Sequence, residues 1–97
     1  MMNMDMFFPT PVWWEQTQLD NTDMLKLCYQ LHTDDDDGRV LSNQGGWQSK
    51  DFRPDAYAEM KPLHDKIMDQ VDNCIRDYGY HEEHCYPIME NFWFNIN

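Results

Sequence analysis

The sequence HEEHC, which contains His81, His84 and Cys85, has the residue types of a metal site. On a helix the two histidines would share one face, and the cysteine could be a third ligand. Gly79 and Pro87 flank the segment, however, and both residue types oppose a stable helix. Since no second cysteine or histidine pair has a spacing typical of zinc, we interpret the segment as a polar loop and predict no metal ligand.

A run of four aspartates, Asp34 to Asp37, precedes Gly38 and suggests a calcium loop. Aligning Gly38 with the invariant glycine of such a loop places Thr33 at the first ligand position. The same alignment places Gln44 where a bidentate glutamate is needed. The pattern therefore fails, and we interpret the run as a solvated loop with loosely held counterions.

The segment SNQGGWQS combines paired glycines with several amide and hydroxyl side chains. Paired glycines permit a positive φ or a close backbone approach, and a tryptophan supplies an amphipathic anchor. The residues alone favour an ordinary turn around a buried tryptophan. The glycine, polar and tryptophan positions that the turn would present are Ser42, Asn43, Gly45, Gly46, Trp47, Gln48 and Ser49.

The segment NFWFNIN alternates between apolar and polar residues, as a strand with two different faces does. Phe92, Phe94 and Ile96 form the apolar face. The opposite face carries Asn91, Trp93, Asn95 and Asn97. A row of amides is costly to bury without partners, so we expect a cavity or further strands beside this face.

Two helices must hold these segments in place. The first is predicted from Thr22 to His32, because apolar residues recur at helical spacing after a group of N-cap candidates. The second is predicted to begin at Pro62 and to carry one apolar stripe from Leu63 to Tyr78. Gly79 is a natural C-terminal stop. We expect this stripe to pack on the apolar face of the last strand.

The remaining segments complete an α+β fold. Met6 to Leu19 is predicted to be an extended edge strand, and Val40 to Ser49 a short strand or loop. Pro54 to Met60 should form one or two helical turns, and Tyr80 to Met89 a connecting loop. We therefore predict a single domain over residues 1–97, with two main helices packed on a small antiparallel sheet.

Charge and cysteine content exclude several classes of function. The net charge of −11 would repel nucleic acid and an anionic membrane surface. Three cysteines at irregular spacing predict no disulfide framework and favour a reducing cytoplasm. The N-terminus lacks the basic region of a signal peptide, and no apolar run approaches the roughly 18 residues that span a membrane.

Three segments together resemble the successive motifs of a known enzyme family. They are FPTPVWW (Phe8 to Trp14), SNQGGWQS (Ser42 to Ser49) and NFWFNIN (Asn91 to Asn97). Their order and spacing, with an amphipathic helix before the third, are similar to those of the 2-oxoglutarate/Fe(II)-dependent oxygenases of bacteriophages and marine bacteria. The resemblance covers essentially the whole chain. It implies the N-terminal part of a double-stranded β-helix oxygenase.

The resemblance also implies which residues belong to the chemistry. In this family a His-x-His or His-x-Asp pair follows the Asn-rich strand, a later histidine completes the Fe(II) ligands, and a basic residue binds 2-oxoglutarate. We expect these groups to lie beyond Asn97, so that this chain carries no catalytic or metal-binding residue and is inactive alone. Fe(II) and 2-oxoglutarate are implied only for the complete family member. The resemblance implies that Trp93, Asn95 and Asn97 form part of the cosubstrate pocket wall, and that the Ser42 to Ser49 residues named above form the active-site rim.

Two hypotheses remain open from the sequence. In the first, the chain is a truncated or split oxygenase that pairs with a complementary C-terminal half, or with itself, through its terminal strand. In the second, it is a small acidic phage protein that acts as a non-catalytic binding or inhibitory module. Both place it in the cytoplasm, which is the host cytoplasm if a phage encodes it.

Overall fold

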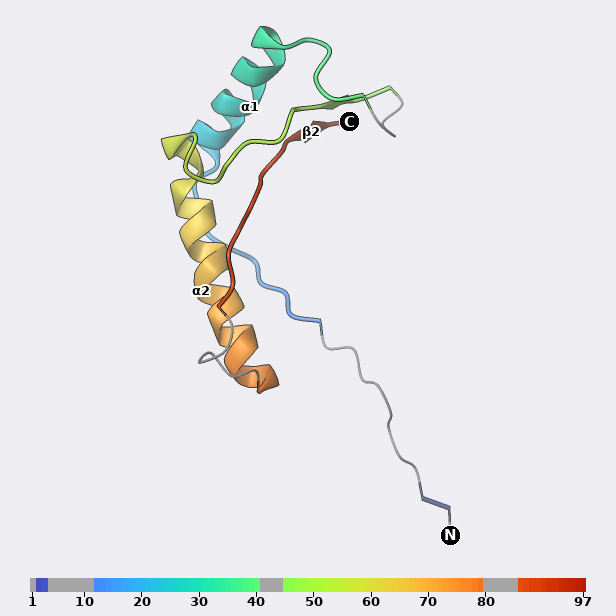
Figure 1. Ribbon diagram of the computed structural model, residues 1–97, viewed down its shortest axis with the longest axis vertical. Coiled ribbons are helices and arrows are strands. Elements are labelled where there is room, and N and C mark those ends of the chain that lie inside the picture. Colours follow the sequence, from blue (N-terminus) through green and yellow to red (C-terminus); the bar gives the residue numbers. More distant parts are fainter. Residues whose placement is uncertain (1, 4–11, 41–44, 80–85) are drawn as a thin grey trace.

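The computed structural model describes residues 2–3, 12–40, 45–79 and 86–97, and Figure 1 shows their arrangement. Expectations for HEEHC and for positions 42 and 43 therefore fall outside the described residues. The elements, in chain order, are α1 (Thr22–Asp34), β1 (Trp47–Gln48), the 3-10 helix η1 (Ala58–Met60), α2 (Lys61–Tyr78) and β2 (Asn95–Ile96). Two helices with one small antiparallel sheet confirm the predicted α+β class.

Helix α1 forms where the apolar spacing predicts it. Its buried residues are Leu27 and Cys28, and burial raises the pKa of the Cys28 thiol. Asp20 stabilises the N-terminus by accepting hydrogen bonds from the Thr22 backbone N–H (3.0 Å) and hydroxyl (2.6 Å). The helix continues two residues past the predicted end at His32, to Asp34. The added turn is closed by a bond from the Asp35 N–H to the Leu31 carbonyl (3.0 Å).

Helix α2 also has its predicted limits. Pro62 lies in its first turn, and Gly79 ends it with a φ of 86° while its N–H donates to the carbonyls of Ile75 and Arg76. The predicted stripe is only half-buried, however, and no residue of α2 is fully buried. Neither α1 nor α2 has the length and apolar content that a membrane-spanning helix requires, as far as the described residues go.

The apolar face of the 92–96 segment is covered by a residue that the sequence did not single out. The ring of Phe52 lies 6.1 Å from that of Phe92 and 5.7 Å from that of Phe94, measured between centroids. Phe52 also contacts Tyr57 in an edge-to-face arrangement (5.1 Å). The ring contact that the structure shows on this face is therefore with Phe52, and the predicted packing of the α2 stripe on the same face stays a prediction.

The small core lies where α1 and α2 meet through η1. Met60, at the end of η1, is its most buried residue, with 2% of its surface exposed. η1 leads directly into α2 and also contacts α1, so it lies between the two helices. Leu27, Cys28 and Trp47 complete the buried apolar set. This core positions the end of α1 against β1, where the candidate site lies.

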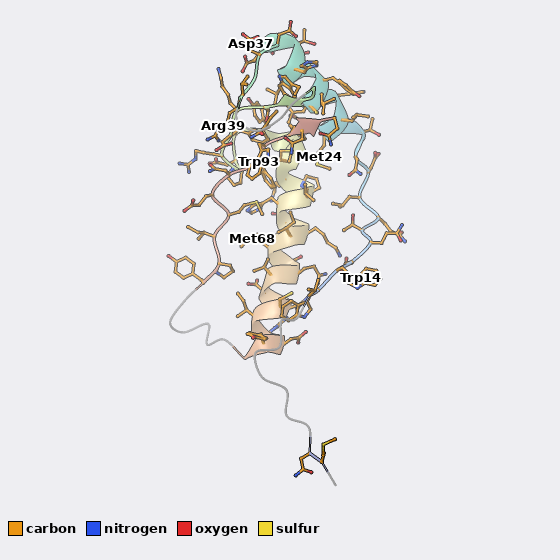
Figure 2. The ribbon with its side chains drawn as sticks, turned by 90° about the vertical axis from the view of Figure 1, so that its right-hand side faces the viewer. Trp14, Met24, Asp37, Arg39, Met68 and Trp93 are labelled. Carbon is orange, nitrogen blue, oxygen red and sulfur yellow. The ribbon has the colours of Figure 1, made fainter. Side chains whose placement is uncertain are left out.

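Residues 12–20 lie alongside α2. They are extended, as predicted, but they pair with no strand in the part of the chain that the structure describes. Trp13 contacts Tyr78 edge-on (6.0 Å between centroids), and Glu15 forms an ion pair with Lys66 (2.8 Å). Figure 2 shows this segment and the segment after residue 86 on opposite sides of α2. The predicted edge strand is therefore wrong for these residues, because Trp13 and Glu15 contact α2 and no strand pairs with the segment.

Candidate functional site

The two motifs singled out in the sequence lie side by side. β1 and β2 pair antiparallel, with Trp47 opposite Ile96 and Gln48 opposite Asn95 (Figure 1). The ladder continues as the Ser49 N–H donates to the Phe94 carbonyl (2.9 Å). Residues far apart in the chain thus form one short ladder, and the rim and pocket-wall candidates border each other.

A bulge interrupts this ladder next to Ser49. The next bridged pair is Phe52 with Phe92, joined by two backbone bonds of 2.9 Å. Two residues, Lys50 and Asp51, therefore lie opposite the single residue Trp93, which is the arrangement of a β-bulge. The Ser49 hydroxyl closes the gap, because it accepts from the Phe94 N–H (2.8 Å) and donates to the Lys50 carbonyl (3.0 Å).

Ser49 is therefore a structural residue, and its replacement should show this. Its exposed fraction is only 3%, so Ser49→Ala would leave the Phe94 N–H without its acceptor in a part-buried position. We expect the free energy of unfolding to fall by about 1–3 kcal/mol in urea denaturation. Thr33→Ala is the matched control, because its hydroxyl also bonds a backbone carbonyl (Tyr29, 3.0 Å) but is exposed. Equal losses for the two variants would contradict this role.

Trp47 joins the sheet to the end of α1. Its indole N–H donates to the Asp35 carbonyl (2.9 Å), and its ring lies 4.8 Å from the His32 ring. The Asp35 carboxylate also accepts from the Gly38 N–H (3.3 Å) and pairs with Lys50 (3.3 Å). The aspartate run is thus more than a solvated loop, because Asp35 holds the turn that leads into β1.

The paired glycines perform the two tasks predicted for them, one each. Gly45 has a φ of 74° in open space. A Cβ atom at Gly46 would lie 2.7 Å from the Ile96 carbonyl oxygen, so this position requires close approach to β2. Both glycines serve the turn into β1 and the edge of the adjoining cleft.

An open cleft of about 470 Å³ lies between the end of α1, the following loop and the ends of both strands. Its lining includes the apolar residues Trp47, Val40 and Ile96 together with the amide of Asn97. Of the polar residues on its other side, Asp36 and Asp37 belong to the aspartate run noted in the sequence, whereas His32 was not singled out, although its i,i+4 pairing with Asp36 (4.0 Å) was a usable pattern. The lining residues are His32, Asp36, Asp37, Val40, Gly45, Gly46, Trp47, Ile96 and Asn97.

The structure therefore divides the candidate residues into two groups. Gly45, Gly46, Trp47 and Asn97 line the cleft. Gln48, Ser49, Trp93 and Asn95 belong to the ladder and its bulge and do not line it. Of the three residues predicted for the pocket wall, Asn97 therefore lines this cleft, whereas Trp93 and Asn95 do not.

One His-x-Asp triplet, His32-Thr33-Asp34, does occur in the sequence, contrary to the expectation that this pair lies only beyond Asn97. It forms the last turn of α1, where residues two apart point to nearly opposite sides of the helix. Asp34 accepts a bond from Gln30 (2.9 Å), while the His32 ring contacts the Trp47 ring at an interplanar angle of 53°. The two side chains therefore do not converge on one ion.

The donor set of the described residues does not fit an Fe(II) site. An Fe(II) oxygenase requires two imidazoles and a carboxylate on one face of the metal. No group of three histidine, cysteine, aspartate or glutamate side chains comes close enough to hold a metal in ranges 12–40, 45–79 and 86–97. We therefore assign no step of metal chemistry to these residues.

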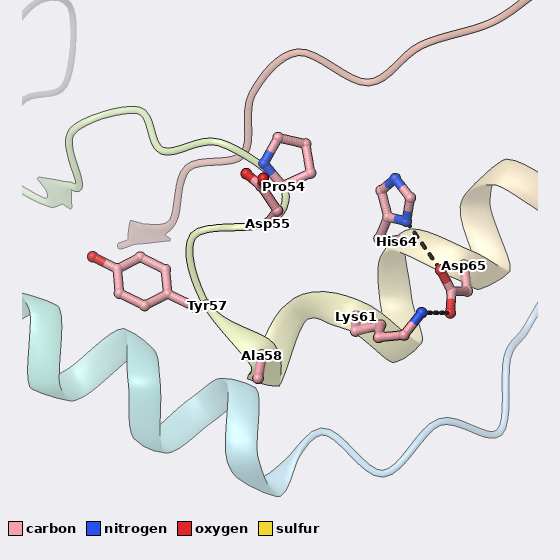
Figure 3. Close-up of a pocket in the computed structure, with 7 residues that line it drawn as sticks. All are labelled: Pro54, Asp55, Tyr57, Ala58, Lys61, His64 and Asp65. Carbon is pink, nitrogen blue, oxygen red and sulfur yellow. Dashed lines mark hydrogen bonds and ion pairs between the residues drawn. The ribbon is translucent and has the colours of Figure 1, made fainter.

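A second hollow, of about 300 Å³, lies at the start of α2 (Figure 3). Asp65 forms an ion pair with Lys61 (2.7 Å), and its other carboxylate oxygen lies 3.1 Å from the His64 ring nitrogen Nδ1. The bonds from Lys61 and then His64 hold the pKa of the Asp65 carboxyl below its ordinary value. The lining residues are Pro54, Asp55, Tyr57, Ala58, Lys61, His64 and Asp65. The charged residues of this hollow therefore form ion pairs on one exposed turn of α2, and Pro54 and Tyr57 lie next to them.

Comparison with known proteins adds no further constraint. No protein-family model matches the sequence, and neither curated proteins nor solved structures gave a match.

Proposed function

We propose that this chain is the N-terminal scaffold of a 2-oxoglutarate/Fe(II)-dependent oxygenase, and that it supplies part of the pocket wall and no metal ligand. The parent reaction is oxidation of a substrate coupled to decarboxylation of 2-oxoglutarate to succinate. The role of this chain is positional. In this proposal, the metal-binding segment would pack next to the Asn-rich segment and the glycine turn.

One observation supports the proposal above the others. The two motifs that carry the family resemblance at 42–49 and 91–97 are separate in the sequence, yet their described residues pair in one ladder. Both also border the same cleft, through Gly46 and Asn97. Motifs that belong to one site are expected to meet in space, whereas unrelated short matches need not.

The proposal predicts how the chain responds to the implied ligands. We expect the purified chain to bind neither Fe(II) nor 2-oxoglutarate at micromolar concentration, because its described residues do not fit the ligand set. Anaerobic calorimetry with Fe(II), with and without 2-oxoglutarate, measures this directly. Binding is expected only after addition of a segment with the His-x-His or His-x-Asp pair and the later histidine.

Tight stoichiometric Fe(II) binding by the chain alone would contradict the proposal. Alanine substitutions at His81, His84 and Cys85 would then test the HEEHC segment, with His64→Ala as the control. The coding sequence after Asn97 gives an independent answer. A metal-binding segment there, in frame or after a frameshift, supports the oxygenase.

The second candidate is a non-catalytic acidic binding module, and the surface of the protein favours it. The net charge is −11, and several large apolar side chains are strongly exposed, among them Trp14 (88%), Tyr86 (80%) and Ile88 (69%). Contiguous apolar surface commonly marks an interaction site, and Tyr86 and Ile88 lie close together in the chain. An unrelated gene after Asn97 would favour this module. For either function we propose a cytoplasmic location, with which the free thiols of Cys28 and Cys74 agree.

A further inference from the structure

We propose that the outer edge of β2 is a docking site for an extended, basic segment of another polypeptide, which adds to the sheet as a third strand. Such strand addition uses main-chain hydrogen bonds for affinity and side chains for specificity. The inference deepens the proposed function by naming the chemistry of the partner at this edge. Only the identity of the docking segment rests on the proposed function, and the docking edge itself is argued independently of it.

The hydrogen-bonding pattern of the ladder determines which backbone groups of β2 face away from β1. The Ser49 N–H donates to the Phe94 carbonyl, and the Phe94 N–H donates to the Ser49 hydroxyl. Phe94 therefore points its backbone groups toward β1. Because these directions alternate along an antiparallel strand, the N–H and carbonyl of Asn95 point away from β1.

The opposite edge of the sheet is already covered. The Arg39 N–H donates to the Gln48 carbonyl (2.7 Å), which is the outward group of β1. Gly38 lies so close that a Cβ atom there would be 2.1 Å from the same oxygen. Strand addition is thus directed to β2, beside which the structure places no other strand within its described residues.

The β2 edge also lacks two of the features that normally protect an exposed edge, charged side chains and proline. Proteins block such edges with charged side chains, prolines or covering loops. Residues 91–97 contain neither a charged residue nor a proline. Asn95 and Asn97 are exposed, and Trp93 retains 51% of its surface. The edge therefore offers hydrogen-bonding groups together with an aromatic surface.

Charge complementarity selects a basic occupant. Exposed Glu90 lies at one end of the segment, and Asp36 and Asp37 share the cleft with Asn97 at the other end. A second copy paired antiparallel would bring Glu90 of each copy toward these aspartates. That arrangement sets acid against acid. A strand with lysine or arginine at its ends would pair with both flanks, and Trp93 would accept a cation on its face.

The test uses a labelled synthetic peptide of alternating valine and threonine with two lysines at each end, followed by fluorescence anisotropy. One control peptide has glutamates in place of the lysines, and another has N-methyl groups on alternate amides. We expect saturable binding of the lysine peptide, binding at least about tenfold weaker for the glutamate peptide, and loss of binding for the N-methylated peptide. Equal binding of the lysine and glutamate peptides would overturn the basic occupant.

Asn95→Pro tests the edge on the protein side. Proline removes the outward N–H of residue 95, whereas Asn95→Ala keeps it, so only the proline variant should lose the peptide. Equal affinity of the two variants, or of the methylated and unmethylated peptides, overturns the site. A dimer in sedimentation that Asn95→Pro abolishes assigns the edge to a second copy and overturns the basic occupant. Since the peptide carries no metal ligand, its binding is independent of the Fe(II) titration that tests the oxygenase proposal.

Discussion

Replacing Gly38 by alanine is expected to lower the free energy of unfolding by about 2–5 kcal/mol, a large effect for a single methyl group. Two costs combine at this position. The φ of 59° lies in the left-handed region, which a residue with a Cβ atom adopts unfavourably. The added Cβ would also lie 2.1 Å from the Gln48 carbonyl oxygen and 2.6 Å from the Trp47 indole nitrogen.

The clash cannot be relieved by moving a flexible side chain. The Gln48 carbonyl is backbone, and it accepts the bond from Arg39 that covers the outer edge of β1. The Trp47 nitrogen is fixed by its bond to the Asp35 carbonyl. Movement at Gly38 therefore breaks a backbone bond, an indole bond, or both. Urea denaturation, analysed for both the midpoint and its slope, measures the loss.

Gly45→Ala separates the two costs. Gly45 has a similar φ of 74°, but nothing lies within 4 Å of the position its Cβ would take. We expect only the conformational cost there, about 1–2 kcal/mol. A loss at Gly38 no larger than that at Gly45 would mean that the turn shifts without breaking its bonds, contrary to this account.

The local parts of this fold were predictable because their causes are local. The limits of α2 follow from Pro62 and Gly79, and the start of α1 follows from polar residues before an apolar repeat. The alternation of residues 91–97 is also confirmed, since odd-numbered positions are exposed and even-numbered ones half-buried. Each of these patterns depends on residues only a few positions apart.

The long-range parts were not predictable from pattern alone. Strand propensity at residues 12–14 does not distinguish pairing in a ladder from packing on a helix, and Trp13 packs on Tyr78. Apolar alternation in 92–96 does not say which residue covers it, and Phe52 does so. The bulge at Ser49 depends on the register between segments distant in sequence.

The candidate site shows the same division. The paired glycines near a tryptophan correctly predicted a positive φ, which Gly45 has, and a close backbone approach, which Gly46 makes, because both depend on the missing side chain of glycine. The sequence could not show that the end of α1 brings His32 and Asp36 to the same cleft. That contact depends on Asp35, whose carbonyl and carboxylate hold Trp47, Gly38 and Lys50.

Trp47→Ala is expected to have the largest effect on stability, a loss of about 3–5 kcal/mol. Trp47 is 94% buried, since its exposed fraction is 6%, and it contacts His32 while bonding to Asp35. The substitution removes the aromatic volume and the link between α1 and β1 together. Trp47→Phe keeps most of the ring but removes the indole donor, so we expect an intermediate loss of about 1–3 kcal/mol.

Trp93→Ala is the matched control, because Trp93 also lies in the paired segments but has half of its surface exposed (51%). We expect its free energy of unfolding to stay within about 0.5 kcal/mol of the wild type. The same variant should weaken binding of the lysine peptide, since Trp93 lies on the proposed docking edge. The two variants would then show that Trp47 is required for the stability of the fold, whereas Trp93 is required for binding of the peptide. Comparable losses of stability at the two positions would mean that Trp93 is covered in solution, and that the edge of β2 is not open as the structure has it.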